Sequence, residues 1–222
     1  MAEIGDFSST ACLAAQPIYD RAGMVQLCPT ASHPNFAPGS PWSFGIVGTQ
    51  AGEGPFVARY AVQKLGKKRI AVLYINNDWG IVSRDLFIKA AKEMGADIVA
   101  VESYFETDKD FTGVLTKLRG QKPELLLHPV LLQRGGADQQ AAREARLDRR
   151  DHDWGPGSLY SPKLLEIGGD SVNGLTPAPR SSPKDPQPEV QKFVKGFEAK
   201  YKSTPNTFAV VAYDLDQLCS HS

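Results

Sequence analysis

The chain has few cysteines and no excess of either charge. Its 222 residues include three cysteines, and 25 Lys and Arg residues are balanced by 25 Asp and Glu residues. Three irregularly spaced cysteines exclude a disulfide scaffold and a cysteine-based zinc site; one intramolecular pair can form, and one thiol must remain. Balanced charge provides no net field that would attract nucleic acid or an anionic membrane surface. We therefore expect no nucleic-acid partner.

Long apolar runs are also absent. No segment reaches the roughly 18 apolar residues of a membrane span, and residues 1–7 contain no basic region followed by an apolar run. As written, the chain is predicted to be soluble and to carry no export signal. It begins almost directly in a Ser/Thr-rich loop, without the strand that should precede such a loop. We therefore expect that N-terminal sequence is missing.

Motifs of catalysis and of cofactor binding do not occur. The four histidines lack metal-ligand spacing, and the chain has no Gly-x-Ser-x-Gly elbow, P-loop or dinucleotide fingerprint. Asp6, Ser9 and His33 have the composition of a nucleophilic set, but this composition is common and establishes no geometry. Asp78 and Asp110 are better interpreted as a loop acceptor and a helix-start charge. We expect neither an enzyme nor a bound cofactor.

Two Ser/Thr-rich loops are the main functional signal. Residues 6–10 and 29–34 are separated by one helix-length segment and one apolar strand, so both are predicted to open on the same edge of a sheet. Hydroxyls and the unpaired backbone N–H groups of a first helical turn are suited to hold a carboxylate, because the helix dipole favours negative charge there. The two loops therefore predict a small-molecule cleft for an anionic or zwitterionic ligand.

Hydrophobic periodicity predicts an alternation of helices and strands. Helices are expected at residues 9–22, 51–65, 81–94, 111–118, 162–167, 189–201 and 207–218. Strands are expected at residues 24–28, 42–47, 69–75, 98–104, 124–128 and 172–178. Such alternation with short connections favours a parallel sheet covered by helices on both faces. The hydrophobic content of 41% is sufficient for one or two compact domains.

One charged segment interrupts this alternation. Residues 143–153 are mostly charged where another strand is due, so no central strand is expected to form from them. Two interpretations remain open, a solvated loop or a local frame error in an otherwise regular gene. Residues 155–158, Gly-Pro-Gly-Ser, are then expected to form an ordinary loop.

A series of short motifs runs through nearly the whole chain. They comprise residues 6–10, 17–19, 27–34, 50–55, 69–75, 77–80, 110–111 and 155–163. In this order and spacing, the motifs resemble those of the branched-chain amino acid (leucine/isoleucine/valine) binding proteins of ABC importers. The resemblance implies the type I periplasmic binding fold, an α/β fold of two doubly wound parallel-sheet lobes joined by a hinge, here N-terminally truncated. Lobe one would hold residues 1–46 plus 186–222, and lobe two would hold residues 47–185.

The resemblance also implies a set of ligand-binding residues. They are Ser9, Thr10, Thr30, Ala31 and Ser32 in lobe one, and Trp79 and Ser158 in lobe two. In the family, the positions of Ser9, Thr30 and Ser32 contact the α-carboxylate and α-amino groups of the ligand, and the position of Trp79 covers an apolar substrate side chain. Alternatively, Ser9 and Ser32 only cap helices or turns, and Trp79 only packs against the helix that it precedes.

Two features of the family are absent from this sequence. An aromatic pair expected after residues 125–128 is replaced by Val130 and Leu131. In some relatives an acidic residue binds the ammonium group of the ligand. That residue would fall near Gly157 or Ser158, where no carboxylate occurs. Relatives that bind amides, aromatic acids or other small carboxylates would tolerate the loss of this acidic residue, so the expected ligand class is wider than amino acids.

The resemblance implies a periplasmic solute-binding protein. It would close two lobes over an amino acid or a related small carboxylate or amide and present the closed form to the membrane permease of an ABC importer. Because no export signal is present, a cytosolic ligand-sensing regulatory module of the same fold is the alternative. A third interpretation is a fragment that binds nothing, in which an unpaired strand edge beside residues 143–153 favours aggregation.

Overall fold

The computed structural model describes residues 2–108, 110–127, 152–156, 175–178 and 182–220. The strands are β1 (Ala2–Ile4), β2 (Val25–Leu27), β3 (Ser43–Phe44), β4 (Arg69–Ile75), β5 (Asp97–Tyr104), β6 (Leu125–Leu127), β7 (His152–Pro156) and β8 (Leu175–Ala178). The helices are α1 (Ser9–Ala22), α2 (Gln50–Arg59), α3 (Asp78–Glu93), α4 (Thr112–Gly120), α7 (Pro188–Tyr201) and α8 (Thr207–Ser220). A 3-10 turn covers Ala37–Gly39, and a π-helical turn at Tyr60–Lys64 continues α2.

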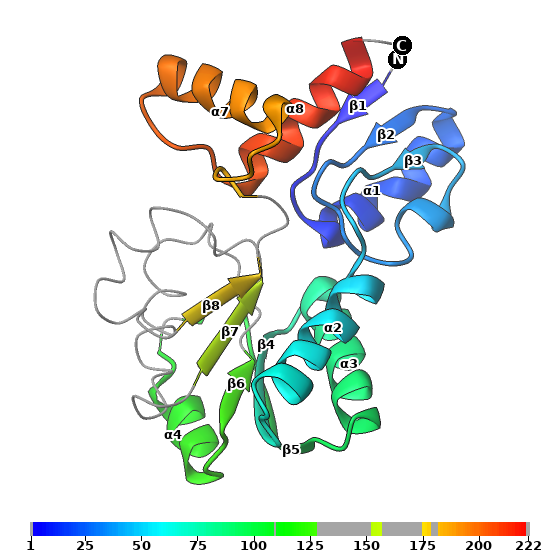
Figure 1. Ribbon diagram of the computed structural model, residues 1–222. Helices are drawn as coiled ribbons and strands as arrows, with labels where there is room; N and C mark the ends of the chain where they lie inside the picture. The colour runs from blue at the N-terminus through cyan, green and yellow to red at the C-terminus, as the bar shows by residue number, and fades with distance from the viewer. Residues whose placement is uncertain (1, 109, 128–151, 157–174, 179–181, 221–222) are drawn as a thin grey trace.

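These elements gather into two lobes (Figure 1). The first lobe contains β1–β3 with α1, α7 and α8, and the second lobe contains β4–β8 with α2–α4. Strand β1 and helix α8, the first and last described elements of the chain, both belong to the first lobe. The chain therefore leaves the first lobe after β3 and returns to it with α7. The boundaries at residues 46 and 186 stay a prediction.

The second lobe is built on a five-stranded parallel sheet with the order β5-β4-β6-β7-β8. Strand β4 is apolar along nearly its whole length, as expected for a central parallel strand that is buried on both faces. Ile70 and Val72 pack against α2 and α3, whereas Leu73 and Ile75 pack on the opposite face against α4. Helices on both faces of this strand order make the lobe doubly wound, as the alternation predicted.

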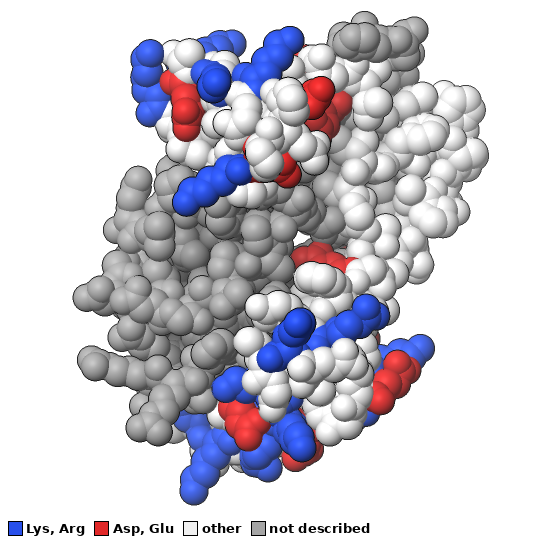
Figure 2. All heavy atoms as spheres, viewed as in Figure 1, with Lys and Arg blue, Asp and Glu red and all other residues white. Residues whose placement is uncertain are grey.

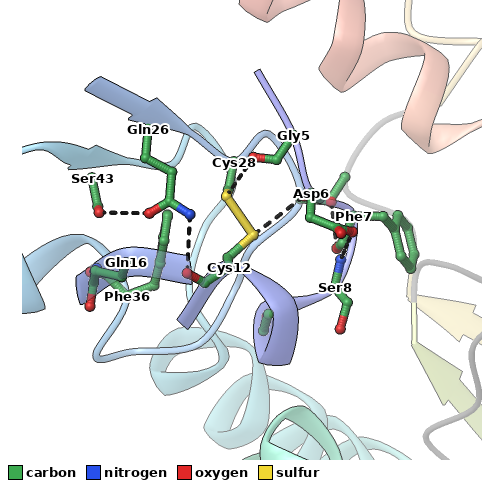
Figure 3. Close-up of a disulfide and its surroundings, with 12 residues drawn as sticks. Gly5, Asp6, Phe7, Ser8, Cys12, Gln16, Gln26, Cys28, Phe36 and Ser43 are labelled. Carbon is green, nitrogen blue, oxygen red and sulfur yellow. Dashed lines mark hydrogen bonds between the residues drawn. A yellow bond between two sulfur atoms is a disulfide. The ribbon is translucent and has the colours of Figure 1, made fainter. Parts of the chain in front are cut away.

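The first lobe is built on a three-stranded parallel sheet with the order β1-β2-β3. Helix α1 follows β1 and ends at Gly23, whose φ of 58° lies in the left-handed region that glycine tolerates best. A disulfide joins Cys12 of α1 to Cys28, which directly follows β2 (Figure 3). The buried Gln26 side chain donates from Nε2 to the Cys12 carbonyl at 3.0 Å and accepts from the Ser43 hydroxyl at 3.0 Å. Polar and covalent links therefore hold this small sheet to its helix.

The two C-terminal helices pack through aromatic side chains. The ring centroids of Phe193 in α7 and Tyr213 in α8 are 4.6 Å apart. Phe208 at the start of α8 makes an edge contact with Phe7, with ring centroids 5.0 Å apart. The contact between Phe7 and Phe208 links the N-terminal loop at residues 6–10 to the C-terminal part of the chain.

Charge is distributed unevenly over the molecule. Figure 2 shows Lys, Arg, Asp and Glu side chains over α7 and over the lower part of the second lobe, while the region of β2, β3 and α1 is mostly uncharged on this face. This agrees with the sequence, in which no Lys, Arg, Asp or Glu occurs between Arg21 and Glu53. Within the described part of the chain, no helix is long and apolar enough to cross a membrane.

Two expectations about strands were wrong. Strand β1 does precede the loop at residues 6–10, and its Ile4 lies opposite Leu27 of β2. Strand β7 begins with the last two residues of the charged segment at 143–153 and continues to Pro156. It pairs with β6, so this edge of β6 is not open. Both strands form by backbone hydrogen bonding to a neighbouring edge, which does not require apolar side chains. Several predicted features lie outside the described residues, because residues 128–151 and 157–174 are not described. They are Val130, Leu131, the helix predicted at 162–167 and the rest of the charged segment.

One helix start was also predicted too late. Helix α3 begins at Asp78 rather than at residue 81, because the Asn77 side chain caps it by accepting a hydrogen bond from the Gly80 backbone N–H at 2.9 Å. Trp79 therefore lies in the first turn of α3 and not in a loop. The other described helices confirm their predicted positions to within a few residues, although the segment predicted as one helix at 51–65 changes from α to π geometry at Tyr60.

Candidate functional site

The two Ser/Thr-rich loops meet at the start of α1. Ser9 is the first residue of α1 and only 3% of its surface is exposed, while Ser32 in the second loop is 5% exposed. The Ser32 backbone N–H donates to the Ser9 Oγ at 3.3 Å. The structure therefore brings together these two predicted site residues, which are separated by 23 positions in the sequence.

Trp79 reaches this pair from the other lobe. Its indole Nε1–H donates to the Ser32 Oγ at 3.1 Å. The half-buried ring also packs against the apolar cluster of the second lobe that contains Ile75 and Tyr104. The packing interpretation of Trp79 is therefore confirmed, and the residue also contacts a loop of the first lobe. That it covers a substrate side chain stays a prediction.

The remaining predicted site residues have different surroundings. The Thr30 hydroxyl donates to the Phe7 carbonyl at 2.8 Å, so its proton already joins the two loops. Ala31 is buried beside the disulfide. The Thr10 Oγ1 is buried and has no hydrogen-bond partner among the described residues, an arrangement that is uncommon for a buried hydroxyl. Ser158 lies outside the described residues.

The disulfide connects the backbones of the two loops. Cys12 lies one helical turn after Ser9, and Cys28 lies two residues before Thr30. Figure 3 shows the disulfide beside the loop that carries Asp6, Phe7 and Ser8. The pair closes a sequence separation of 16 residues and has no exposed surface. The covalent bond therefore limits how far the loops can separate.

Gln50 is part of this site although no role was predicted for it. Gln50 is 2% exposed, and its backbone N–H donates to the Ser32 carbonyl at 2.9 Å. Its side-chain Nε2 donates to the Trp79 carbonyl at 2.7 Å and to the Ser83 hydroxyl. The only sequence signal was its position at the start of the motif at residues 50–55, which does not identify hydrogen-bond partners.

His33 brings an ionisable group to the same place. It is 9% exposed, and the Asn35 backbone N–H donates to its Nδ1 at 3.1 Å, so this nitrogen is unprotonated. Burial lowers the pKa of His33 below 6.5, and the nearby negative charge of Asp78 partly opposes this effect. The neutral imidazole is therefore favoured in the folded protein.

The nucleophilic set considered from composition does not form. The Asp6 carboxylate accepts from the Ser8 backbone N–H at 3.1 Å, the Ser9 hydroxyl oxygen accepts from Ser32, and His33 accepts from Asn35. Each of the three residues is thus engaged with a different group. No cluster of three or more His, Cys, Asp or Glu side chains suited to a metal ion occurs within the described ranges.

The geometry and the fold together define a class of protein. Two parallel-sheet lobes that contact each other through Ser32 and Trp79 have the architecture of the type I periplasmic binding fold. Residues 2–218 match the family described as periplasmic binding protein, and the chain belongs to this family.

Similar proteins agree with this assignment. The chain is 25% identical over 216 residues to the leucine-, isoleucine-, valine-, threonine-, and alanine-binding protein of Pseudomonas aeruginosa. The matched region covers 95% of this chain and 56% of that protein. A solved structure from Rhodospirillum rubrum is provisionally assigned to a branched-chain amino acid ABC transporter. It is 34% identical to this chain and superposes with a TM-score of 0.72, and the match covers 95% of this chain and 60% of that chain.

A further solved structure has a different kind of ligand. It is a solute-binding protein of an ABC transporter from Rhodopseudomonas palustris BisB5 in complex with 3,4-dihydroxybenzoic acid. It is 25% identical with a TM-score of 0.83, over 94% of this chain and 58% of that chain. The chain thus spans 56% to 60% of the length of these three relatives.

Proposed function

We propose that the chain is a solute-binding protein of an ABC importer, which binds a branched-chain amino acid or a related small carboxylate between its two lobes. The observation that carries the proposal is the hydrogen-bonded connection from Ser9 through Ser32 to Trp79. It places two hydroxyl-bearing residues of one lobe against an indole of the other. A ligand with a carboxylate at one end and an apolar group at the other matches this arrangement.

The carboxylate end of the ligand belongs at the start of α1. The first turn of a helix offers backbone N–H groups without intrahelical partners, and the hydroxyls of Ser9 and Thr10 add further donors. The apolar end belongs against Trp79. Partial burial of the roughly 150–250 Å² of an indole side chain contributes on the order of a few kcal/mol. Branched-chain amino acids and benzoates both satisfy this division.

Binding works by shifting a population of conformations. Contacts to both lobes exist only when the lobes are closed, so the ligand stabilises closure by the difference in contact free energy between the two forms. The permease of the importer then distinguishes the closed form from the open form. No bond in the ligand is made or broken.

An extracytoplasmic location is supported by the disulfide as well as by the family. Disulfides persist in oxidising compartments such as the periplasm and are rare in the cytosol. The Cys12–Cys28 pair therefore favours a periplasmic protein over the cytosolic ligand-sensing module.

Isothermal titration tests the proposal directly. The chain is titrated with L-leucine, L-isoleucine, L-valine, benzoate and 3,4-dihydroxybenzoate, with far-UV circular dichroism as the control for folding. At least one of these compounds is expected to bind and to raise the unfolding temperature. A cooperatively folded sample that binds none of them would contradict the proposal.

A further inference from the structure

Ser32, Gln50 and Trp79 form a closed triangle of hydrogen bonds. The Gln50 backbone N–H donates to the Ser32 carbonyl at 2.9 Å, and the Gln50 Nε2 donates to the Trp79 carbonyl at 2.7 Å. The Trp79 Nε1–H closes the triangle by donating to the Ser32 Oγ at 3.1 Å. Each residue therefore bonds to both of the others, although they come from the first-lobe loop, the start of α2 and the start of α3.

Gln50 lies where the chain passes from one lobe to the other. The chain runs from β3 of the first lobe into α2 of the second lobe, and Gln50 is the first residue of α2 (Figure 1). Its backbone bonds to the first lobe and its side chain bonds to the second lobe. A residue with these contacts restricts the position of Trp79 relative to Ser32, because it is bonded to each of them.

An amide side chain fits the hydrogen bonds at this position. The Gln50 Nε2 has two hydrogens, and it donates one to the Trp79 carbonyl and the other to the Ser83 hydroxyl. A carboxylate of the same size donates no hydrogen bond and would bring a charge into a site that is 2% exposed. The amide Oε1 of Gln50 is buried and accepts no hydrogen bond within the described part of the chain, so packing alone does not explain a polar side chain here.

We propose that Gln50 is a positioning residue of the ligand site, which holds Trp79 and Ser32 in register across the two lobes. The expected effect of Gln50 on affinity rests on the proposed binding of a ligand between the lobes. Its effect on the position of Trp79 does not depend on any ligand. Gln50 preorganises the two sides of the site, so a ligand that contacts both of them loses less freedom on binding.

The test compares Gln50→Leu with Gln16→Leu. Gln16 is a matched control, because it is a buried glutamine whose Nε2 donates to a backbone carbonyl, that of Phe36 at 2.6 Å, entirely within the first lobe. The first measurement is the indole N–H signal of Trp79 in a ¹H–¹⁵N NMR spectrum of the ligand-free chain. The sequence has three tryptophans, and the Trp79 signal is identified by its loss in Trp79→Phe.

We expect Gln50→Leu to shift the Trp79 indole signal and to speed its exchange with solvent, while Gln16→Leu leaves both unchanged. The second measurement is the affinity for L-leucine and for benzoate by titration. Gln50→Leu is expected to weaken binding of whichever probe the wild type binds about tenfold, which corresponds to about 1.4 kcal/mol. Gln16→Leu lowers only the unfolding temperature.

An unchanged indole signal in Gln50→Leu, or an equal change in Gln16→Leu, overturns the inference. If the wild type binds none of the five compounds titrated above, the proposed function fails, and the indole signal still decides the role of Gln50. If Gln50→Leu does not fold, Ser83→Ala removes one acceptor of the Gln50 amide and buries no new group. A smaller shift of the same indole signal then supports the inference, and no shift contradicts it.

Discussion

The two lobes are held together by different physical means. In the second lobe, the seven-residue β4 and the eight-residue β5 carry apolar side chains that pack against helices on both faces of the sheet. In the first lobe, β1 and β2 have three residues each and β3 has two. That lobe relies on a disulfide and on buried amide side chains that donate to backbone carbonyls.

The second lobe therefore contributes mainly to stability, and the first lobe contributes mainly to the positions of the site residues. Apolar burial scales with area and has no direction, so the second lobe provides a stable base for the start of α3. Hydrogen bonds and a covalent link do have direction, and the first lobe uses them to hold Ser9 and Ser32 at a defined separation. The candidate site lies where a lobe stabilised mainly by burial meets a lobe organised by polar contacts.

The largest expected effect is in the apolar core of the second lobe. Phe87 of α3 is 1% exposed in the cluster between α2, α3 and β4. Phe87→Ala is expected to lower the free energy of unfolding by about 3–5 kcal/mol, because it removes buried surface and leaves a cavity. Urea denaturation followed by circular dichroism measures this. Phe56→Ala in α2, whose side chain is 58% exposed, is the control and is expected to change stability little. Equal losses in the two variants would show that burial is not the basis of this lobe.

The next effect is in the covalent link of the first lobe. Replacing Cys12 and Cys28 by alanine is expected to cost about 3 kcal/mol, as for loops of about 15 residues, and to weaken ligand binding because the two loops separate more freely. Thermal unfolding with and without dithiothreitol provides the measurement. Cys219→Ser, which leaves the pair intact, is the control. A wild type whose unfolding temperature is insensitive to complete reduction would contradict this role of the disulfide.

A smaller effect is expected at the contact between the lobes. Ser32→Ala and Trp79→Phe each remove one side of the Nε1–H to Oγ hydrogen bond. Each is expected to weaken binding of L-leucine or benzoate by about fivefold to tenfold, in line with about 1 kcal/mol for one hydrogen bond. Titration of the single and double variants measures their coupling. Trp42→Phe is the control, since Trp42 is in the first lobe and belongs to neither loop. Fully additive losses would indicate that Ser32 and Trp79 do not act together.

The smallest effect is a pH dependence in the first lobe. The pKa of His33 is lowered in the folded protein, mainly by burial, so the unfolded chain binds the proton first as the pH falls below about 6.5. Stability is therefore unaffected by His33 above this pH and decreases below it. Urea denaturation at pH 7 and pH 5 is expected to show a larger loss for the wild type than for His33→Asn, which keeps an acceptor for the Asn35 N–H. The same loss in both proteins would assign the acid sensitivity to other groups.

Local patterns in the sequence were sufficient for much of the second lobe. The apolar run at residues 69–75 predicts β4, and the spacing of Phe111, Leu115 and Leu118 predicts the face that α4 buries. These signals are reliable because a strand or helix that is buried has to repeat apolar side chains at its own period. In the first lobe, the end of the helix at residues 9–22 follows in the same way from the left-handed backbone conformation that Gly23 tolerates.

The sequence by itself determined the order of helices and strands and the two Ser/Thr-rich loops, because each depends on residues close together in the chain. It also determined the resemblance to a family, because each of the motifs is short and their order can be read along the chain. Tertiary structure decided the rest. Strands β1 and β7 form on neighbouring edges, the Thr30 hydroxyl bonds to the Phe7 carbonyl, and Gln50 joins Ser32 to Trp79. These features depend on partners that are far apart in sequence, and the direction of a hydrogen bond is defined only when the fold has placed both groups.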